Sequence, residues 1–196
     1  MSPRNKQKLE KIRDGRTTQI KNIALKLFAR YGYSGTKTSV IAAEAGISEG
    51  LIYRYYKSKE ELFSELIKEH LDEARRKLEY LPCLQGSSFD QIKALTENMM
   101  DENNKYAFIL IERARRDDDI PKKVTEILEK YSASTMIDTL IPIFAKGQEL
   151  GEFSREDPRR LAFWYFFIIN SICIQEWRYD EYGMPSVEVL MRILTK

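Results

Sequence analysis

Residues 48–59, SEGLIYRYYKSK, combine hydroxyl, aromatic and cationic side chains in one short stretch. Serine and tyrosine hydroxyls and lysine or arginine cations donate hydrogen bonds to phosphate oxygens, and such contacts position a protein on nucleic acid. Catalysis is not indicated, because the chain has one histidine, His70, no nucleotide-binding glycine motif and no nucleophile triad. Cys83 and Cys173 stand far apart with no CxxC spacing. The sequence therefore predicts binding chemistry, with no metal and no cofactor.

Charge is divided unevenly along the 196 residues. Residues 1–57 hold twelve lysines and arginines against four acids, a net charge of +8, and the remainder carries a net charge of −6. A basic N-terminal part is typical of proteins that bind nucleic acid or an anionic membrane surface. A solvated basic tail explains residues 1–13 equally well. A sequence-tolerant architectural DNA-binding protein and a membrane-surface protein stay open as alternatives at this point.

Apolar spacing predicts the first helix over residues 17–31, with Thr17 as its N-cap and Gly32 as its end. The apolar side chains recur at i, i+3, i+4, i+7 and beyond, so they form one stripe. That stripe consists of Ile20, Ile23, Ala24, Leu27, Phe28 and Tyr31.

Two short helices follow, separated by Gly46, which suits a turn that needs a positive φ. The second begins after Ser48, a suitable N-cap, and should bury Ile52 and Tyr56. Its other side chains then point away from the core: Glu49, Gly50, Tyr53, Arg54 and Lys57. A helix-turn-helix has this arrangement, and its second helix reads the major groove. A structural helical hairpin is the alternative, but it leaves the charge division unexplained.

The rest of the chain is predicted to be helical as well, so the fold class is all-α. A helix over 57–78 should begin with Ser58 and Glu61 as a capping box, and Pro142 should kink the helix that contains it. Domain boundaries are predicted at 1–57, with 1–14 as a flexible basic arm, and at 58–196. Further helices are predicted near 88–104, 105–116, 121–149, 157–179 and 186–195.

Three segments, ALKLFARYGYSGT, IAAEAGIS and GLIYRYYKSKEEL, resemble in order and spacing the N-terminal DNA-binding domain of TetR-family transcriptional regulators. The resemblance covers roughly residues 15–65. It implies a three-helix helix-turn-helix domain followed by a larger helical domain for ligand binding and dimerisation. It also implies a double-stranded DNA operator as partner and no enzymatic activity.

Carried over residue by residue, the resemblance implies that Thr38 and Ser39 open the first helix of the motif near DNA. It implies phosphate contacts at Ser48, Tyr53 and Lys59, and groove-facing positions at Glu49, Gly50, Arg54 and Tyr55. Glu49 departs from the lysine, threonine or glutamine common there, which affects base preference, because a carboxylate accepts from cytosine N4 but repels phosphate. Lys37 and Tyr56 also depart from the family's usual threonine and phenylalanine.

The family resemblance further implies a homodimer formed by the last two helices. The sequence supports this separately, because residues 161–174 are apolar nearly all round and should be buried on both sides. The central helix of a monomeric bundle is the alternative. A small-molecule effector site is implied in the middle helices, although aromatic and methionine residues at helical spacing are often plain core. Its candidate lining residues are Phe89, Met99, Tyr106, Phe108, Phe144 and Trp164.

The sequence therefore predicts a ligand-responsive repressor. It should bind a near-palindromic operator as a homodimer and be released by a small apolar molecule. The N-terminus lacks an apolar secretory segment, and the longest apolar run is shorter than the roughly 20 residues that a bilayer span needs. A cytoplasmic protein without membrane partners is expected.

Overall fold

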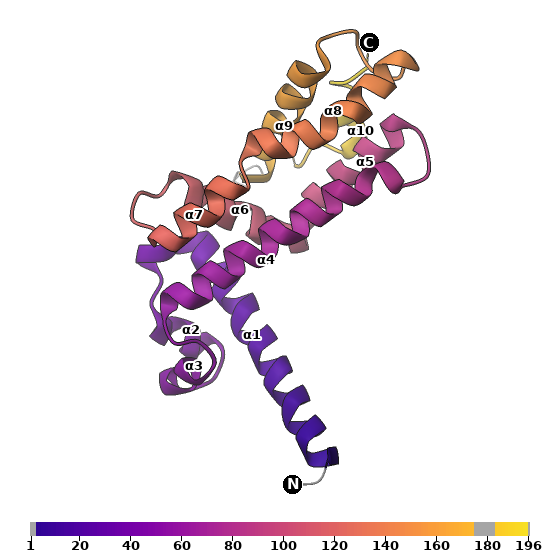
Figure 1. Cartoon of the computed structure of the whole chain (residues 1–196). Coiled ribbons are helices and arrows are strands. Elements are labelled where there is room, and N and C mark those ends of the chain that lie inside the picture. The colour runs from indigo at the N-terminus through magenta and orange to yellow at the C-terminus, as the bar shows by residue number, and fades with distance from the viewer. Residues whose placement is uncertain (1–2, 175–182, 196) are drawn as a thin grey trace. The chain divides into compact units, whose positions relative to one another are not determined.

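The described part of the chain in the computed structural model is built from helices. The structure describes the backbone of residues 3–174 and 183–195, and the side chains in those ranges except at 3–12, 102, 103 and 133. The described residues contain no strand, which confirms the all-α prediction (Figure 1). The α-helices are α1 Pro3–Gly35, α2 Thr38–Glu44, α3 Glu49–Tyr55, α4 Lys59–Tyr80, α5 Ser88–Met100, α6 Glu102–Arg116, α7 Lys122–Lys130, α8 Ala133–Glu149, α9 Pro158–Ile174 and α10 Val187–Met191, with a 3₁₀ turn at Leu81–Cys83.

The chain divides into two compact units. The first holds residues up to His70 together with Ile109–Ile127, and the second holds Leu71–Phe108 and the residues from Leu128 onward. The first unit therefore extends beyond the predicted boundary at residue 57. The reason is that the first half of α4 buries its apolar side chains, Phe63 among them, in the core of this unit, where the Phe63 ring lies 4.8 Å from that of Phe28.

The first helix is longer than the predicted 17–31. It begins at Pro3, so residues from 3 onward are helical rather than a flexible arm, and Thr17 lies inside the helix instead of capping it. The Thr17 hydroxyl donates to the carbonyl oxygen of Arg13 at 3.0 Å, one turn earlier. Lysine, glutamine, glutamate and arginine in this segment are good helix formers, and proline is well tolerated at a helix start.

Gly32 interrupts α1 as predicted, with φ 75° and ψ 178°. This left-handed φ is costly for any residue with a Cβ atom. The apolar stripe before it is buried at Ile20, Ala24 and Phe28, whereas Tyr31 is exposed. The buried part of the predicted stripe therefore ends before Tyr31.

The second unit has its core between α5, α8, α9 and α10. The single helix predicted over 121–149 is two helices, α7 and α8, because Ser132 adopts an extended conformation and its hydroxyl caps α8 by accepting from the Thr135 amide. Pro142 lies inside α8. The described part of the helix predicted at 157–179 is α9, and residues 175–179 lie outside the described residues.

Two further boundaries differ from the predictions. Asp101 has extended ψ, so α5 ends at Met100 and α6 begins at Glu102. The last predicted helix, 186–195, is α-helical only at Val187–Met191, and residues 192–195 continue with i to i+3 backbone hydrogen bonds. Such tightened turns are common at helix ends.

Gly147 on α8 marks a close contact in the second unit. A Cβ atom there would lie 2.3 Å from Cδ2 of Phe153 and 3.0 Å from Cβ of Ser88. Gly147→Ala should therefore lower stability by about 1–3 kcal/mol through overpacking, despite alanine's better helix propensity. Gly15→Ala on α1 is the matched control, because a Cβ atom there meets nothing within 4 Å. Thermal unfolding should show opposite shifts, and a Gly147→Ala variant as stable as wild type would contradict this close packing.

Candidate nucleic-acid interface

α2 and α3 form the helix-turn-helix that the sequence predicts. The turn passes through Gly46, whose φ is 64°, and the amide of Ile47 donates to the carbonyl oxygen of Ala42 at 3.0 Å. The buried Ile41, Ala42 and Ala45 anchor α2. Lys37 is the residue before α2, so Thr38 and Ser39 open this helix as expected.

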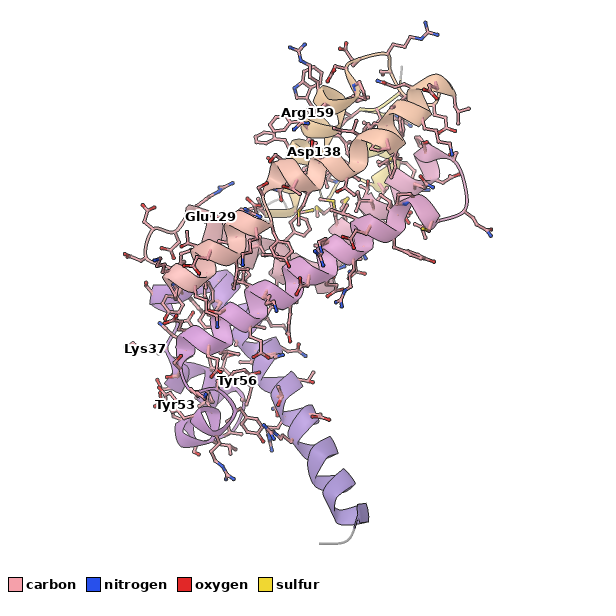
Figure 2. The ribbon with its side chains drawn as sticks, viewed as in Figure 1. Lys37, Tyr53, Tyr56, Glu129, Asp138 and Arg159 are labelled. Atoms are coloured by element: carbon pink, nitrogen blue, oxygen red, sulfur yellow. The ribbon has the colours of Figure 1, made fainter. Side chains whose placement is uncertain are left out.

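α3 has one buried face and one exposed face. Ile52 and Tyr56 are buried, whereas Tyr53 is 49% exposed and Arg54 is exposed. Tyr53 and Tyr56 are labelled in Figure 2. Glu49, Gly50 and Lys57 are also exposed, and Tyr55 is half-buried. Ser48 holds the N-cap position, although its side chain makes no capping hydrogen bond. The predicted division of α3 into two faces is therefore confirmed, while the contacts of these residues with DNA stay predictions.

Thr38 joins the start of α2 to the exposed face of α3. Its side-chain oxygen Oγ1 donates to Oε1 of Glu49 at 2.5 Å and lies 3.2 Å from the Tyr53 hydroxyl. Thr38 is only 9% exposed, whereas Ser39 beside it is exposed. The structure thus brings together three residues that the sequence named only as separate DNA contacts.

Lys59 has a role in the protein fold that the sequence did not indicate. Its Nζ donates to the carbonyl oxygens of Tyr33 and Thr36 at 2.8 and 3.0 Å, and it lies 4.2 Å from the centroid of the Tyr33 ring. Burial lowers the pKa of Lys59. Two of the three ammonium donors are therefore engaged with the turn that leads into α2, and a phosphate contact would have to use the remaining donor.

Ion pairs between distant residues of the sequence hold α1 against α4. Nζ of Lys21 lies 2.7 Å from Oε1 of Glu65 and 2.5 Å from Oε1 of Glu69. Burial raises the pKa of Tyr56 to about 12, so this phenol stays neutral at any physiological pH. Lys21 is 44 residues from Glu65 in the sequence, and periodicity carries no signal for such a pair.

Arg113 on α6 belongs to the same unit and closes the end of α1. Its Nη1 donates to the carbonyl oxygens of Ala29 and Arg30 at 3.0 and 2.5 Å, just before the interruption at Gly32. A cation beside these carbonyl oxygens suits the negative end of the helix dipole. Arg113 therefore supports the helix against which α2 packs.

The six predicted ligand-lining residues occupy different environments in the second unit. Met99 and Phe144 are buried core residues, and Phe89 and Phe108 are half-buried beside that core. The ring centroids of Phe144 and Tyr165 lie 6.2 Å apart. Tyr106 and Trp164 are exposed. The six side chains therefore differ in burial, and ligand binding by them stays a prediction.

One face of α9 exposes large aromatic side chains, while its opposite face is in the core. Phe163, Trp164 and Phe167 are exposed, and the rings of Phe163 and Phe167 stack with centroids 6.2 Å apart. Nη1 of Arg159, at the start of this helix, lies 2.5 Å from Oδ1 of Asp138 on α8. Both residues are labelled in Figure 2. Large apolar side chains exposed together on one face are typical of interaction sites.

Within the described residues, no group of three or more histidine, cysteine, aspartate or glutamate side chains could hold a metal ion. In the same part of the chain, no helix is both long and apolar enough to cross a bilayer.

A helix-turn-helix whose second helix exposes tyrosine and arginine on a rigid three-helix support defines a DNA-binding transcriptional regulator. Residues 21–66 match the family model of bacterial regulatory proteins, tetR family. The matched residues contain α2 and α3 and form a DNA-binding domain of the TetR type.

Several similar proteins match this chain over nearly its whole length. The HTH-type transcriptional regulator YfiR of Bacillus subtilis is 28% identical over 188 residues, which cover 91% of this chain and 87% of YfiR. The structure of the ketosteroid transcriptional regulator KstR2 of Mycobacterium tuberculosis superposes with a TM-score of 0.72 at 19% identity, covering 92% and 95% of the two chains. The structure of FadR from Bacillus subtilis in complex with stearoyl-CoA superposes with a TM-score of 0.60 at 22% identity, covering 90% and 97%.

Proposed function

We propose that this protein is a homodimeric repressor in the bacterial cytoplasm that binds a near-palindromic operator and releases it when a small apolar molecule binds the second unit. The observation that carries the DNA-binding part is the exposed face of α3. Tyr53 and Arg54 lie on that face, while Ile52 and Tyr56 fix its orientation from the other side. Arg54 can donate to guanine edges, and Tyr53 can reach phosphate.

The dimer rests on the aromatic face of α9. Phe163 and Phe167 are exposed in the single chain, and a second copy placed against them would remove this surface from water. A two-fold dimer places two α3 helices on one duplex, and half-sites then lie one helical turn, about 34–36 Å, apart. An operator that is nearly palindromic follows from that symmetry.

The effector class is suggested by the composition of the second unit and by similar proteins. The FadR structure from Bacillus subtilis is a complex with stearoyl-CoA, and KstR2 is a ketosteroid transcriptional regulator. The core of the second unit is rich in leucine, isoleucine and aromatic side chains, which can repack around an acyl chain or a fused ring. Three helices, α4, α6 and α7, have residues in both units. Through these continuous helices, a ligand bound in the second unit can act on the first unit.

The experiment is selection of duplexes from a random DNA pool by the purified protein, followed by affinity measurements on the selected sequence. We expect an inverted repeat, bound at least a hundredfold more tightly than mixed-sequence DNA, and a changed base preference for Arg54→Ala. A panel of acyl-CoA thioesters and steroids should include a compound that weakens operator binding at least tenfold, which corresponds to about 1.4 kcal/mol of coupling. Equal affinity for all duplexes would favour an architectural DNA-binding protein instead.

A further inference from the structure

The hydroxyl groups on the proposed DNA-binding face are already engaged within the protein. Thr38 has a single hydroxyl proton, and Oγ1 donates it to Oε1 of Glu49 at 2.5 Å. The Tyr53 hydroxyl lies 3.2 Å from the same Oγ1. Because the Thr38 proton is committed to the carboxylate, Tyr53 must be the donor in this second contact. The chain of donation therefore runs from Tyr53 to Thr38 to Glu49.

In this order, the hydroxyl protons of Thr38 and Tyr53 are both donated within the protein, and neither is directed to solvent. A phosphate oxygen accepts hydrogen bonds and cannot donate them, so it can bind Tyr53 or Thr38 only by replacing an acceptor that they already have. The acceptor at the end of the chain is a carboxylate on an exposed residue, which also repels phosphate. The Glu49 carboxylate thus resembles the DNA phosphate that it would exclude, because both are negatively charged and both accept hydrogen bonds.

We propose that the Glu49 carboxylate is an internal competitor of DNA phosphate, occupying the Thr38 and Tyr53 donors in the DNA-free protein and weakening binding to every duplex. The inference rests on the proposed function, in which the exposed face of α3 meets DNA. It adds a specific role for Glu49, which lowers non-specific binding, so that only a sequence with good base contacts displaces the carboxylate. Glu49 acts here through its neighbours as a positioning residue.

Glu49→Gln tests the proposal directly. The amide oxygen of glutamine can still accept from Thr38, but it lacks the charge, so phosphate should displace it more easily. We expect affinity for a mixed-sequence duplex of about 30 base pairs to rise at least tenfold, measured by fluorescence anisotropy. The matched control is Glu44→Gln, which removes one exposed carboxylate from α2 and should raise affinity about twofold. Equal gains in the two variants would overturn the proposal.

Salt separates the competition for donors from simple repulsion. At about 0.4 M KCl the long-range effect of an exposed charge is screened, so the small gain from Glu44→Gln should vanish. The gain from Glu49→Gln should persist in part, because the hydroxyl donors stay available at any salt concentration. A gain that disappears completely at high salt would reduce Glu49 to a general repulsive charge and overturn the proposal.

A double-mutant cycle tests whether the gain depends on the two hydroxyls. In a Thr38→Val background, Glu49→Gln should raise affinity no more than the control does. Tyr53→Phe provides a second cycle at an exposed position, in case Thr38→Val destabilises the fold, and circular dichroism reports folding for all variants. An undiminished tenfold gain in the Tyr53→Phe background and in a folded Thr38→Val background would overturn the proposal. If wild-type protein binds no selected duplex at all, the proposed function itself fails, which is a different result from equal binding by wild type and Glu49→Gln.

Discussion

Phe167→Glu should leave the chain folded and convert a homodimer into a monomer. Phe167 is 62% exposed in the single chain, so a glutamate there stays hydrated when the protein is monomeric. In the proposed dimer, the same carboxylate would be buried without a partner, which costs several kcal/mol. Analytical ultracentrifugation should show a monomer, circular dichroism should show unchanged helix content, and operator binding should be lost at concentrations where wild type is saturated.

Ile169→Glu is the counterpart two residues further along the same helix. Ile169 is 0% exposed and belongs to the core of the second unit, so the glutamate should unfold that unit whether or not a dimer forms. Gln85→Glu, at an exposed loop position, adds the same charge and should change neither folding nor assembly. A stable dimer of the Phe167→Glu variant would place the interface elsewhere on the surface.

Lys59→Met should weaken DNA binding more than tenfold and also lower Tm by about 3–6 °C. Removing the ammonium leaves the carbonyl oxygens of Tyr33 and Thr36 without their charged donor, a loss of about 1–2 kcal/mol at this half-exposed position. The turn that contains them leads directly to Thr38. Loosening the turn should therefore displace α2 as well as remove one positive charge.

Lys57→Met is the matched control for Lys59→Met. Lys57 is exposed and two residues away, so its replacement should leave Tm unchanged, lower affinity about threefold and reduce the salt slope by roughly 1. Thermal unfolding and salt titrations of DNA binding distinguish the two variants. Identical behaviour of both would show that Lys59 contributes only its charge.

Patterns within a few residues were predicted well because they depend on local geometry. The two faces of α3 follow from side chains spaced three and four apart, and the interruption at Gly32 follows from glycine's access to positive φ. Helix boundaries were less reliable. Ser132 divides the helix predicted over 121–149, and nothing in the apolar spacing distinguishes that serine from one inside a helix.

The sequence by itself determined that the chain is helical, that its N-terminal part carries a helix-turn-helix, and that residues 161–174 form a strongly apolar helix. Only the tertiary structure decided which polar groups meet. Lys59 reaches Tyr33, Arg113 reaches Ala29, and the Thr38 hydroxyl reaches Glu49. Periodicity tells which side of a helix is buried, because burial depends on the average polarity of a face. The partner of one hydrogen bond depends instead on how separate helices pack, which fixes the positions of atoms from distant parts of the sequence to within a few tenths of an ångström.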